Sequence, residues 1–583
     1  MRIERHRVGE AAVSSAVENF AERIGGEVHR MQHDESPAWG WELVADSFLD
    51  YLGARSVDSP ELTGKDARIA CESAAAAAVG ALALGVGRAG PPHVFIEYTG
   101  TGVPYGEDRK AEESGEVTAP AWLAPFFLAF VARLSDEHDE LFVAAAPPLR
   151  GREQRADVVL VHALLAYVYG GGEPSDELSS DDRVAVIDGL VEELGEGIDR
   201  PGHRAALRTL RAVAAGDRAG FQQALARQLE CHRQRYAGPA GDDPAPRTLL
   251  PFDAIALAAM AERWNRWPVE VESDYLPAAL VGGFRQPAPR VLGFGRRKRA
   301  DALAALAAGP LVVHRPAHPY AEEAGRLIQE GCARRELAKF GDPEQKPQHV
   351  MRALTGLMRG QVLGFLERSV LDPDGRDPRQ WEMLRIGAEA GGAAFRLARG
   401  VPGSAYEVTV AGTTRRLPAC TGSYGPGAGH WKQAVALALI TGERRQLADC
   451  VLVTPELFTV GCYFGPVDAY GAALHDYLRG VDPVPAVTKA FAVCAEHERG
   501  LYLAPPVKLL SQLVEGDRAG FALALADALE AHREHYTVGE LPAEPDALVD
   551  LDVLALACLV HRMGWPVPVS SPYLPGGLFR RPG

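Results

Sequence analysis

The chain has 583 residues, of which 47% are apolar and 24% charged, a composition that is ordinary for globular proteins and excludes a disordered or collagen-like chain. Its net charge of −16 arises entirely in residues 1–290, where 29 Lys and Arg face 45 Asp and Glu (29 − 45 = −16); residues 291–583 hold 32 of each. An acidic surface repels nucleic acid and suits either a basic partner or plain solubility, so we expect no nucleic-acid partner.

The pattern of apolar residues predicts a mainly α-helical chain with short loops. Helices are expected in the first half over residues 11–30, 61–84, 121–135, 156–169 and 181–215, with analogues in the second half. Strand-like text is limited to HVFIEYTG at 93–100 and YEVTVAG at 406–412, each upstream of a helix that begins near a tryptophan. Each half is therefore predicted to be an α-helical domain with one small β-hairpin.

One long stretch of sequence occurs twice. Residues 216–236, GDRAGFQQALARQLECHRQRY, recur as residues 516–536, GDRAGFALALADALEAHREHY. The text from Asp253 likewise resembles that from Asp552, and the helix from Trp122 resembles the one from Trp431. A period near 300 residues is too long for a solenoid unit and indicates a duplicated domain. The join is rich in Gly, Pro and Arg, and the predicted organisation is two homologous domains, 1–288 and 311–583, with a solvated linker at 289–310.

The repeated stretch has the pattern of a capped amphipathic helix. Asp217 and Asp517 stand where an N-cap carboxylate accepts the free N–H groups of the first turn. One helical face then carries the same residue types in both copies: Phe221, Leu225, Leu229, His232 and Tyr236, repeated as Phe521, Leu525, Leu529, His532 and Tyr536. A catalytic His, Glu and Arg set is one interpretation. The other interpretation is a helix cap followed by a His and a Tyr that complete the core face. It is favoured because no nucleophile or metal ligand recurs beside them.

Motifs for nucleotide, metal or nucleophilic chemistry are weak. GVGRAG at 85–90 fits GxGxxG but follows a helix-like run instead of a strand, and GPGAGHWK at 425–432 lacks the P-loop spacing. His314 with His318, and His532 with His535, have ligand-like spacings but no third ligand nearby. We expect no metal and no cofactor, although a site assembled from distant loops would leave no motif.

Targeting and cysteine patterns favour the cytoplasm. The charged N-terminus has no apolar stretch after it, and the longest apolar run, near 74–86, is too short to cross a bilayer. The eight cysteines include no CxxC pair, which is typical of thiols in a reducing compartment. We therefore expect a cytoplasmic protein with no membrane partner.

Two acidic segments distinguish the copies. DEHDE at 136–140 aligns with near-neutral text in the second copy, and EVESDYLP at 270–277 becomes PVSSPYLP at 568–575. The apolar frame is kept in both copies, so packing does not require these carboxylates. A charge run is commonly just a solvated face, but acidity confined to one copy suits a partner surface. The predicted partner-binding residues are Asp136, Glu137, Asp139, Glu140, Glu270, Glu272, Asp274 and Tyr275.

These features together resemble the immunity-49 family of bacterial polymorphic-toxin systems. The resemblance rests on the order of a helix begun by tryptophan, the GDxxxFxxALxxxLExHRxxY stretch, an Ala-rich helix and WPVEVESDYLP, carried by residues 216–236 and 267–277 and again by 516–536 and 565–575. It implies a mainly α-helical cytoplasmic protein that binds and neutralises a cognate toxin and catalyses nothing itself. The tandem arrangement, and the loss of the acidic tail in the second copy, depart from this pattern.

Three functions fit these observations. A toxin-neutralising protein is the first; its acidity suits a basic, nuclease-type toxin because complementary charge speeds encounter. An enzyme or accessory factor of a biosynthetic or modification pathway, built on the same duplicated frame, is the alternative. An adaptor with two docking modules is the third. The neighbouring genes would discriminate between them, since a toxin gene favours the first and a run of biosynthetic genes the second.

Overall fold

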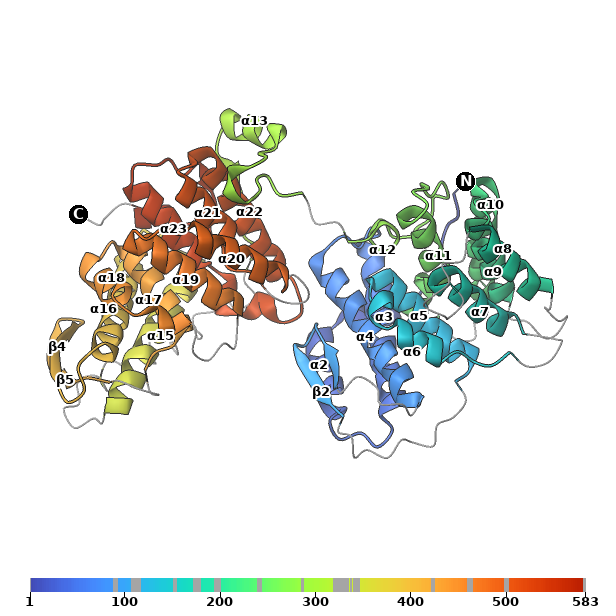
Figure 1. The fold of residues 1–583 in the computed structure, drawn as a ribbon, viewed down its shortest axis with the longest axis horizontal. Coiled ribbons are helices and arrows are strands. Elements are labelled where there is room, and N and C mark those ends of the chain that lie inside the picture. The colour runs from blue at the N-terminus through green and yellow to red at the C-terminus, as the bar shows by residue number, and fades with distance from the viewer. Residues whose placement is uncertain are drawn as a thin grey trace. The chain divides into compact units, whose positions relative to one another are not determined.

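The computed structural model describes residues 2–86, 93–105, 117–149, 155–170, 180–192, 201–237, 244–284, 288–317, 335, 338, 347–420, 425–458, 465–497 and 503–579. The chain divides into two compact units, Met1–Gln286 and Pro287–Gly583. Both are mainly α-helical, and each has one small antiparallel hairpin (Figure 1). The predicted fold class, two homologous helical domains, is confirmed.

The first unit is built around a long apolar helix that packs against two neighbours, α4 against α3 and α5. In its hairpin, β1 (His93–Ile96) pairs with β2 (Thr101–Pro104). The predicted helix 11–30 is split at Asn19, whose φ is 49°. The helices are α1 (Glu10–Val17), α2 (Phe20–Arg30), α3 (Pro37–Asp58), α4 (Lys65–Gly85), α5 (Ala119–Ala132), α6 (Asp139–Ala144), α7 (Ala156–Tyr169), α8 (Ser180–Glu192), α9 (Pro201–Ala214), α10 (Arg218–Tyr236), α11 (Phe252–Arg263) and α12 (Ala278–Gly282), with 3-10 turns η1 (Ser135–Glu137), η2 (Pro246–Leu249) and, at the join with the second unit, η3 (Gly293–Gly295).

The second unit repeats this order. Its hairpin is β4 (Ala405–Val410) with β5 (Thr413–Pro418), and a short parallel pair joins β3 (Leu311–Val312) to β6 (Val569–Ser570). Its helices are α13 (Ala300–Ala308), α15 (Pro347–Leu371), α16 (Pro378–Ala398), α17 (Ala428–Thr441), α18 (Arg444–Val451), α19 (Gly465–Arg479), α20 (Val484–Ala495), α21 (Val507–Glu515), α22 (Arg518–His535) and α23 (Leu551–Arg562), with 3-10 turns η4 (Pro455–Phe458), η5 (Leu541–Ala543), η6 (Pro545–Ala547) and η7 (Gly576–Phe579).

The two tryptophans that open α5 and α17 occupy equivalent positions. Both side chains are fully buried. The indole N–H of Trp122 donates to the carbonyl of Phe142 at 2.8 Å, and that of Trp431 to the carbonyl of Cys450 at 2.9 Å. A buried indole needs such a partner, so each tryptophan fixes the following short helix, α6 or α18, against the core.

The repeated stretch forms α10 and α22 with the predicted caps. Asp217 Oδ1 accepts from the N–H of Gly220 at 2.8 Å, and Asp517 Oδ1 from that of Gly520 at 3.0 Å. Gly216 and Gly516, with φ of 68° and 72°, supply the left-handed turn before each cap. The N-cap prediction is confirmed in both copies.

The duplication extends further toward the N-terminus of each unit than the sequence indicated. Arg5 donates to the hydroxyl and the carbonyl of Ser56 at 2.9 and 3.0 Å, and Arg315 makes the same two bonds to Ser369 at 3.2 and 2.8 Å. The backbone N–H of Ile3 donates to Glu272, as that of Val313 does to Ser570. Each unit therefore begins with an extended segment that pairs with its own C-terminal tail.

The predicted linker packs on the second unit. Arg290 pairs with Asp527 and Glu530 of α22, and Lys298, inside the basic cluster 296–299, pairs with Asp517. Helix α13 lies against α22, as Figure 1 shows. These contacts order residues 288–310 on the face of α22. On the equivalent face of α10, Arg2, Ile3 and Glu4 line a pocket together with side chains of α10.

One described helix, Lys65–Gly85, is long and apolar enough to span a membrane by length and composition, and 78% of that apolar window is buried inside the first unit. This burial is what the core helix of a folded domain shows. Six of the eight cysteines lie in the described ranges, and all six are free thiols. Burial raises the pKa of Cys71 and Cys558 to about 12, so both thiols stay protonated at neutral pH.

Candidate functional site

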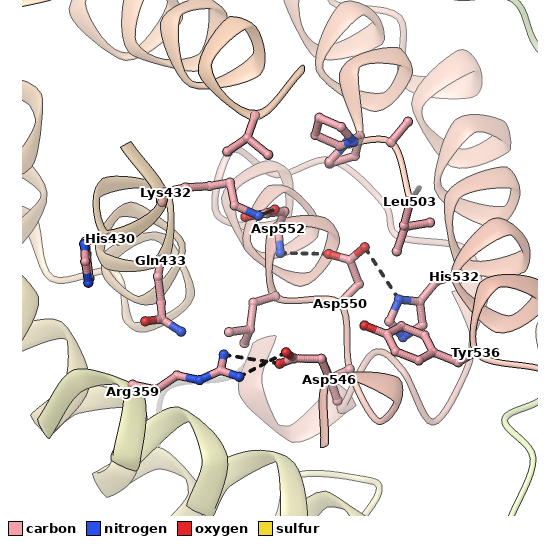
Figure 2. Close-up of a pocket in the computed structure, with 17 residues that line it drawn as sticks. Arg359, His430, Lys432, Gln433, Leu503, His532, Tyr536, Asp546, Asp550 and Asp552 are labelled. Atoms are coloured by element: carbon pink, nitrogen blue, oxygen red, sulfur yellow. Dashed lines mark hydrogen bonds and ion pairs between the residues drawn. The ribbon is translucent and has the colours of Figure 1, made fainter. Parts of the chain in front are cut away.

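A polar pocket of about 570 Å³ opens in the second unit (Figure 2). Helices α15, α17, α22 and α23 and the turn η6 supply its charged side chains, whereas Val467, Leu503 and two prolines form an apolar part of the wall. The pocket exists because the N-terminus of α23 brings three carboxylates together within seven residues, namely Asp546, Asp550 and Asp552.

Lys432 of α17 and Asp552 of α23 form an ion pair in the wall of this pocket. Burial alone would lower the pKa of Lys432, but Asp552 raises it above its ordinary value. Burial raises the pKa of Asp552, and Lys432 offsets this only in part. In the first unit, Leu123 occupies the position of Lys432. Asp253, the equivalent of Asp552, instead accepts a hydrogen bond from the side-chain amide of Gln228 at 2.9 Å. The carboxylate is common to both units, but its partner is not.

Asp550 lies between the backbone of α23 and His532 (Figure 2). Its Oδ1 caps the helix by accepting from the N–H groups of Asp552 and Val553, both at 3.0 Å, while Oδ2 lies 3.8 Å from Nδ1 of His532. His532 Nε2 donates to the carbonyl of Ala547 at 3.3 Å, so a neutral ring presents a lone pair at Nδ1. Burial lowers the pKa of His532, against the influence of Asp550. Two acceptors therefore face one another.

A second ion pair joins Arg359 of α15 to Asp546 at 3.1 Å. Its equivalent in the first unit has the opposite polarity: Arg247, beside η2, lies 3.4 Å from Asp46 of α3. The positions correspond because Ser56 and Ser369 make the same bonds to Arg5 and Arg315 along α3 and α15. Both side chains of the pair were exchanged between the copies.

The side chains that line the pocket are suited to binding a polar group. Among the described residues that line it there is no Ser, Thr or Cys to act as a nucleophile. Lys432 and Arg359 are already paired with carboxylates, so Asp550 and His532 leave an excess of hydrogen-bond acceptors. The pocket would suit a group that donates hydrogen bonds. Sequence reasoning did not single out Lys432 or the three aspartates; the only signal was a lysine within an otherwise apolar helix.

The histidines and tyrosines of the repeated helix are part of the core. His232 Nε2 donates to the carbonyl of Thr248 at 2.7 Å, and its ring packs against Tyr236 and Tyr275 with centroids 5.0 and 5.3 Å away. His532 repeats this with Tyr536 and Tyr573. The interpretation as cap plus core is the one that the contacts support. GVGRAG lies mostly outside the described residues, as does His318.

The first predicted acidic segment lies on the surface of the first unit. Asp136 and Glu137 are in η1, Asp139 and Glu140 open α6, and all four side chains are exposed. The nearby Tyr169 hydroxyl donates to the carbonyl of Ser135 at 3.1 Å, which holds the turn. These carboxylates therefore lie at the surface of the first unit.

The second predicted segment is exposed except for its tyrosine. Glu270, Glu272 and Asp274 lie at the surface, and Glu270 pairs with Arg218. Tyr275 is fully buried, and its hydroxyl accepts from the backbone N–H of His6 at 2.9 Å. Tyr275 thus fixes the tail to the N-terminal segment and does not lie on the surface. The structure places the two acidic segments on separate elements of the first unit.

The family model described as immunity protein 49 matches the chain twice, over residues 57–280 and 372–578. The chain belongs to the immunity protein 49 family. Membership implies a toxin as the binding partner. No curated protein and no solved structure matches the chain. Both matched ranges leave most or all of α3 and α15 outside, although these helices are equivalent parts of the two immunity protein 49 domains.

Proposed function

We propose that the protein neutralises a basic, nuclease-type toxin of a bacterial polymorphic-toxin system by binding it in the cytoplasm through the first unit. Family membership supports the role as an immunity protein. The observation that carries the choice of unit is the charge: residues 1–290 hold the whole net charge of −16, and both acidic segments are exposed there. A nuclease toxin needs a basic surface for its own substrate, and that surface attracts an acidic partner. The free cysteines fit a reducing compartment.

The test is protection of cells that express the toxin encoded beside this gene. The full chain should restore growth. Replacement of Glu270, Glu272 and Asp274 by Ser should slow association with the toxin, and the difference should shrink as salt rises because exposed charges are screened.

A matched control replaces three exposed carboxylates of the second unit, Glu407, Glu496 and Glu540, by Ser. It removes the same charge from the other unit and should leave association nearly unchanged. Equal slowing by both triple variants would show that total charge, and not a surface on the first unit, governs binding. Failure of the unaltered chain to protect against any neighbour-encoded toxin would overturn the proposed function.

A further inference from the structure

A groove of about 620 Å³ lies between α3, α4 and α5 of the first unit. Alanine is the most frequent residue of its lining, at six of sixteen positions, and Leu49, Leu82 and Leu128 also line it. Along α3 the lining runs from Ala38 to Leu49, about 16 Å at 1.5 Å per residue, the length of three helical turns. Neither acidic segment contributes to it, so it is a separate feature of the same unit.

The second unit shows why this groove is open. Along α3 and α15, Ala38 corresponds to Met351 and Ala45 to Met358, in the register set by Ser56 and Ser369. The equivalent ion pairs Arg68–Glu72 and Arg385–Glu389 set the register of α4 and α16 in the same way.

In that register Ala78 of α4 corresponds to Phe395 of α16. Met351, Met358 and Phe395 are all buried in the core of the second unit, where Met358 packs against Gly391. The first unit has replaced three large side chains by alanine, and the space they would fill is left open to solvent. The second unit folds with this space filled by side chains, so folding does not require the space to stay open in the first unit.

Two carboxylates stand in the groove. Burial raises the pKa of Glu42, and Asp46 raises it further; burial also raises the pKa of Asp46. Asp46 shares Arg247 with Asp50, whereas Glu42 has no hydrogen bond or ion pair within the described part of the chain. The corresponding residues of the second unit are Thr355 and Arg359. Among the described residues of the first unit, no cation fully balances the negative charge of the groove.

Two large apolar side chains of α3 are exposed, and each is next in sequence to a residue that lines the groove. Trp39 is 61% exposed and Leu43 45%, and they lie one helical turn apart, on the side of Asp46. Tryptophan is one of the residue types that are enriched at the centre of protein interfaces. Arg352 and Gly356 take these positions in the second unit.

We infer that this groove binds an amphipathic segment of the toxin, about three helical turns long. Apolar side chains of that segment would enter between α3 and α5, and a Lys or Arg of the segment would pair with Glu42 and Asp46. The inference rests on the proposed function and names the chemistry of the partner. Complementarity of charge selects a cation, because no described residue pairs with Glu42. The alanine lining favours apolar side chains of the toxin, because burial of apolar surface against it lowers the free energy of binding.

The decisive variant is Ala38→Met with Ala45→Met, which gives the first unit the residues that close the second. Ala74→Gly is added to this variant, because Met358 packs against Gly391 and the equivalent residue of the first unit is Ala74. The resulting chain should fold, as its thermal midpoint will show, and it should bind the toxin at least tenfold more weakly by calorimetry with the full chain. The control Ala11→Met with Ala219→Met adds the same atoms at exposed helix positions and should bind as the parent does.

A second variant, Glu42→Thr, copies Thr355 and leaves the Asp46 pair intact. It should weaken binding severalfold, with a loss that shrinks at high salt. If both variants bind the toxin as tightly as the parent chain does, and the parent chain protects cells, the groove is not the toxin-binding site, whereas the proposed function still holds. A parent chain that binds no neighbour-encoded toxin would overturn both.

Discussion

The first and second units share the same arrangement of helices and strands but differ in the side chains packed between them. Trp122 and Trp431, the caps Asp217 and Asp517, and the paired terminal strands are equivalent in both. The first unit leaves an alanine-lined groove where the second packs methionines, and the second has a buried Lys432–Asp552 pair where the first has a neutral amide. The features that differ are therefore those that folding does not require, and these are where function should be sought.

The largest expected effect tests the shared frame. Trp122→Ala and Trp431→Ala each remove a fully buried indole and its hydrogen bond, and each should cost about 3–5 kcal/mol of the unfolding free energy of its own unit. Urea denaturation read by pulsed hydrogen exchange, with peptides assigned to each unit, would measure both. Costs that differ by more than about twofold, the usual context dependence of one such substitution, would break the equivalence of the two cores.

The Lys432–Asp552 pair offers a sharper difference. Lys432→Leu leaves a buried carboxylate without its cation and should destabilise the second unit by roughly 3 kcal/mol at neutral pH. The pKa of Asp552 is already raised, so the cost should shrink as pH falls and the carboxyl becomes protonated. Adding Ala528→Gln rebuilds the amide partner of the first unit and should restore part of the loss; no restoration would mean that the two arrangements are not interchangeable.

The stability of the two units should also respond differently to acid pH. Burial lowers the pKa of His6 from 6.5 to about 4, and lowers that of His232; the residue that follows Arg315 in the second unit, by contrast, is Pro316. A histidine held neutral stabilises the fold above its ordinary pKa, and this stability is lost as pH falls from 6.5 toward 4. His6 should therefore make the first unit lose stability over this range, in addition to the loss that His232 and His532 cause in both units. His6→Gln should flatten its pH profile, and an unchanged slope would contradict this account.

The smallest effect concerns the caps. Asp217→Ala should cost roughly 1 kcal/mol, the usual loss for a helix cap. Asp517 also pairs with Lys298, so Asp517→Ala should cost a few tenths more. Replacing Lys298 by Ala in the Asp517→Ala background should then have no further effect. A further loss there would show that Lys298 stabilises α13 by other contacts.

The sequence predicted the frame because the frame recurs. The periodic apolar face of residues 216–236, its cap and the tryptophan helices are local patterns, and all of them formed as expected. Helix α3 was not predicted, because its sequence, PAWGWELVADSFLDYL, places exposed Trp39 beside Gly40 and buried Trp41 and so lacks a clear apolar stripe. The groove could not be foreseen without it.

Long-range pairing was likewise invisible in the sequence. The segment 289–310 has the composition of a linker, but its ordered contacts depend on Asp517, Asp527 and Glu530, more than 200 residues later. Lys432 and Asp552 are 120 positions apart, and only the fold brings them together. The acidic segments were found because they are charge runs; whether they bind the toxin remains the prediction that the triple Ser variant tests.

The exchanged polarity of the pairs Asp46–Arg247 and Arg359–Asp546 has a consequence for how a tandem chain folds. Two homologous domains synthesised one after the other can trade equivalent helices and become trapped in a swapped state. If α15 took the place of α3, Arg359 would face Arg247, and α3 in the second unit would set Asp46 against Asp546. Both mispairings bring like charges together, so the reversal penalises the swapped state while each native pair stays intact.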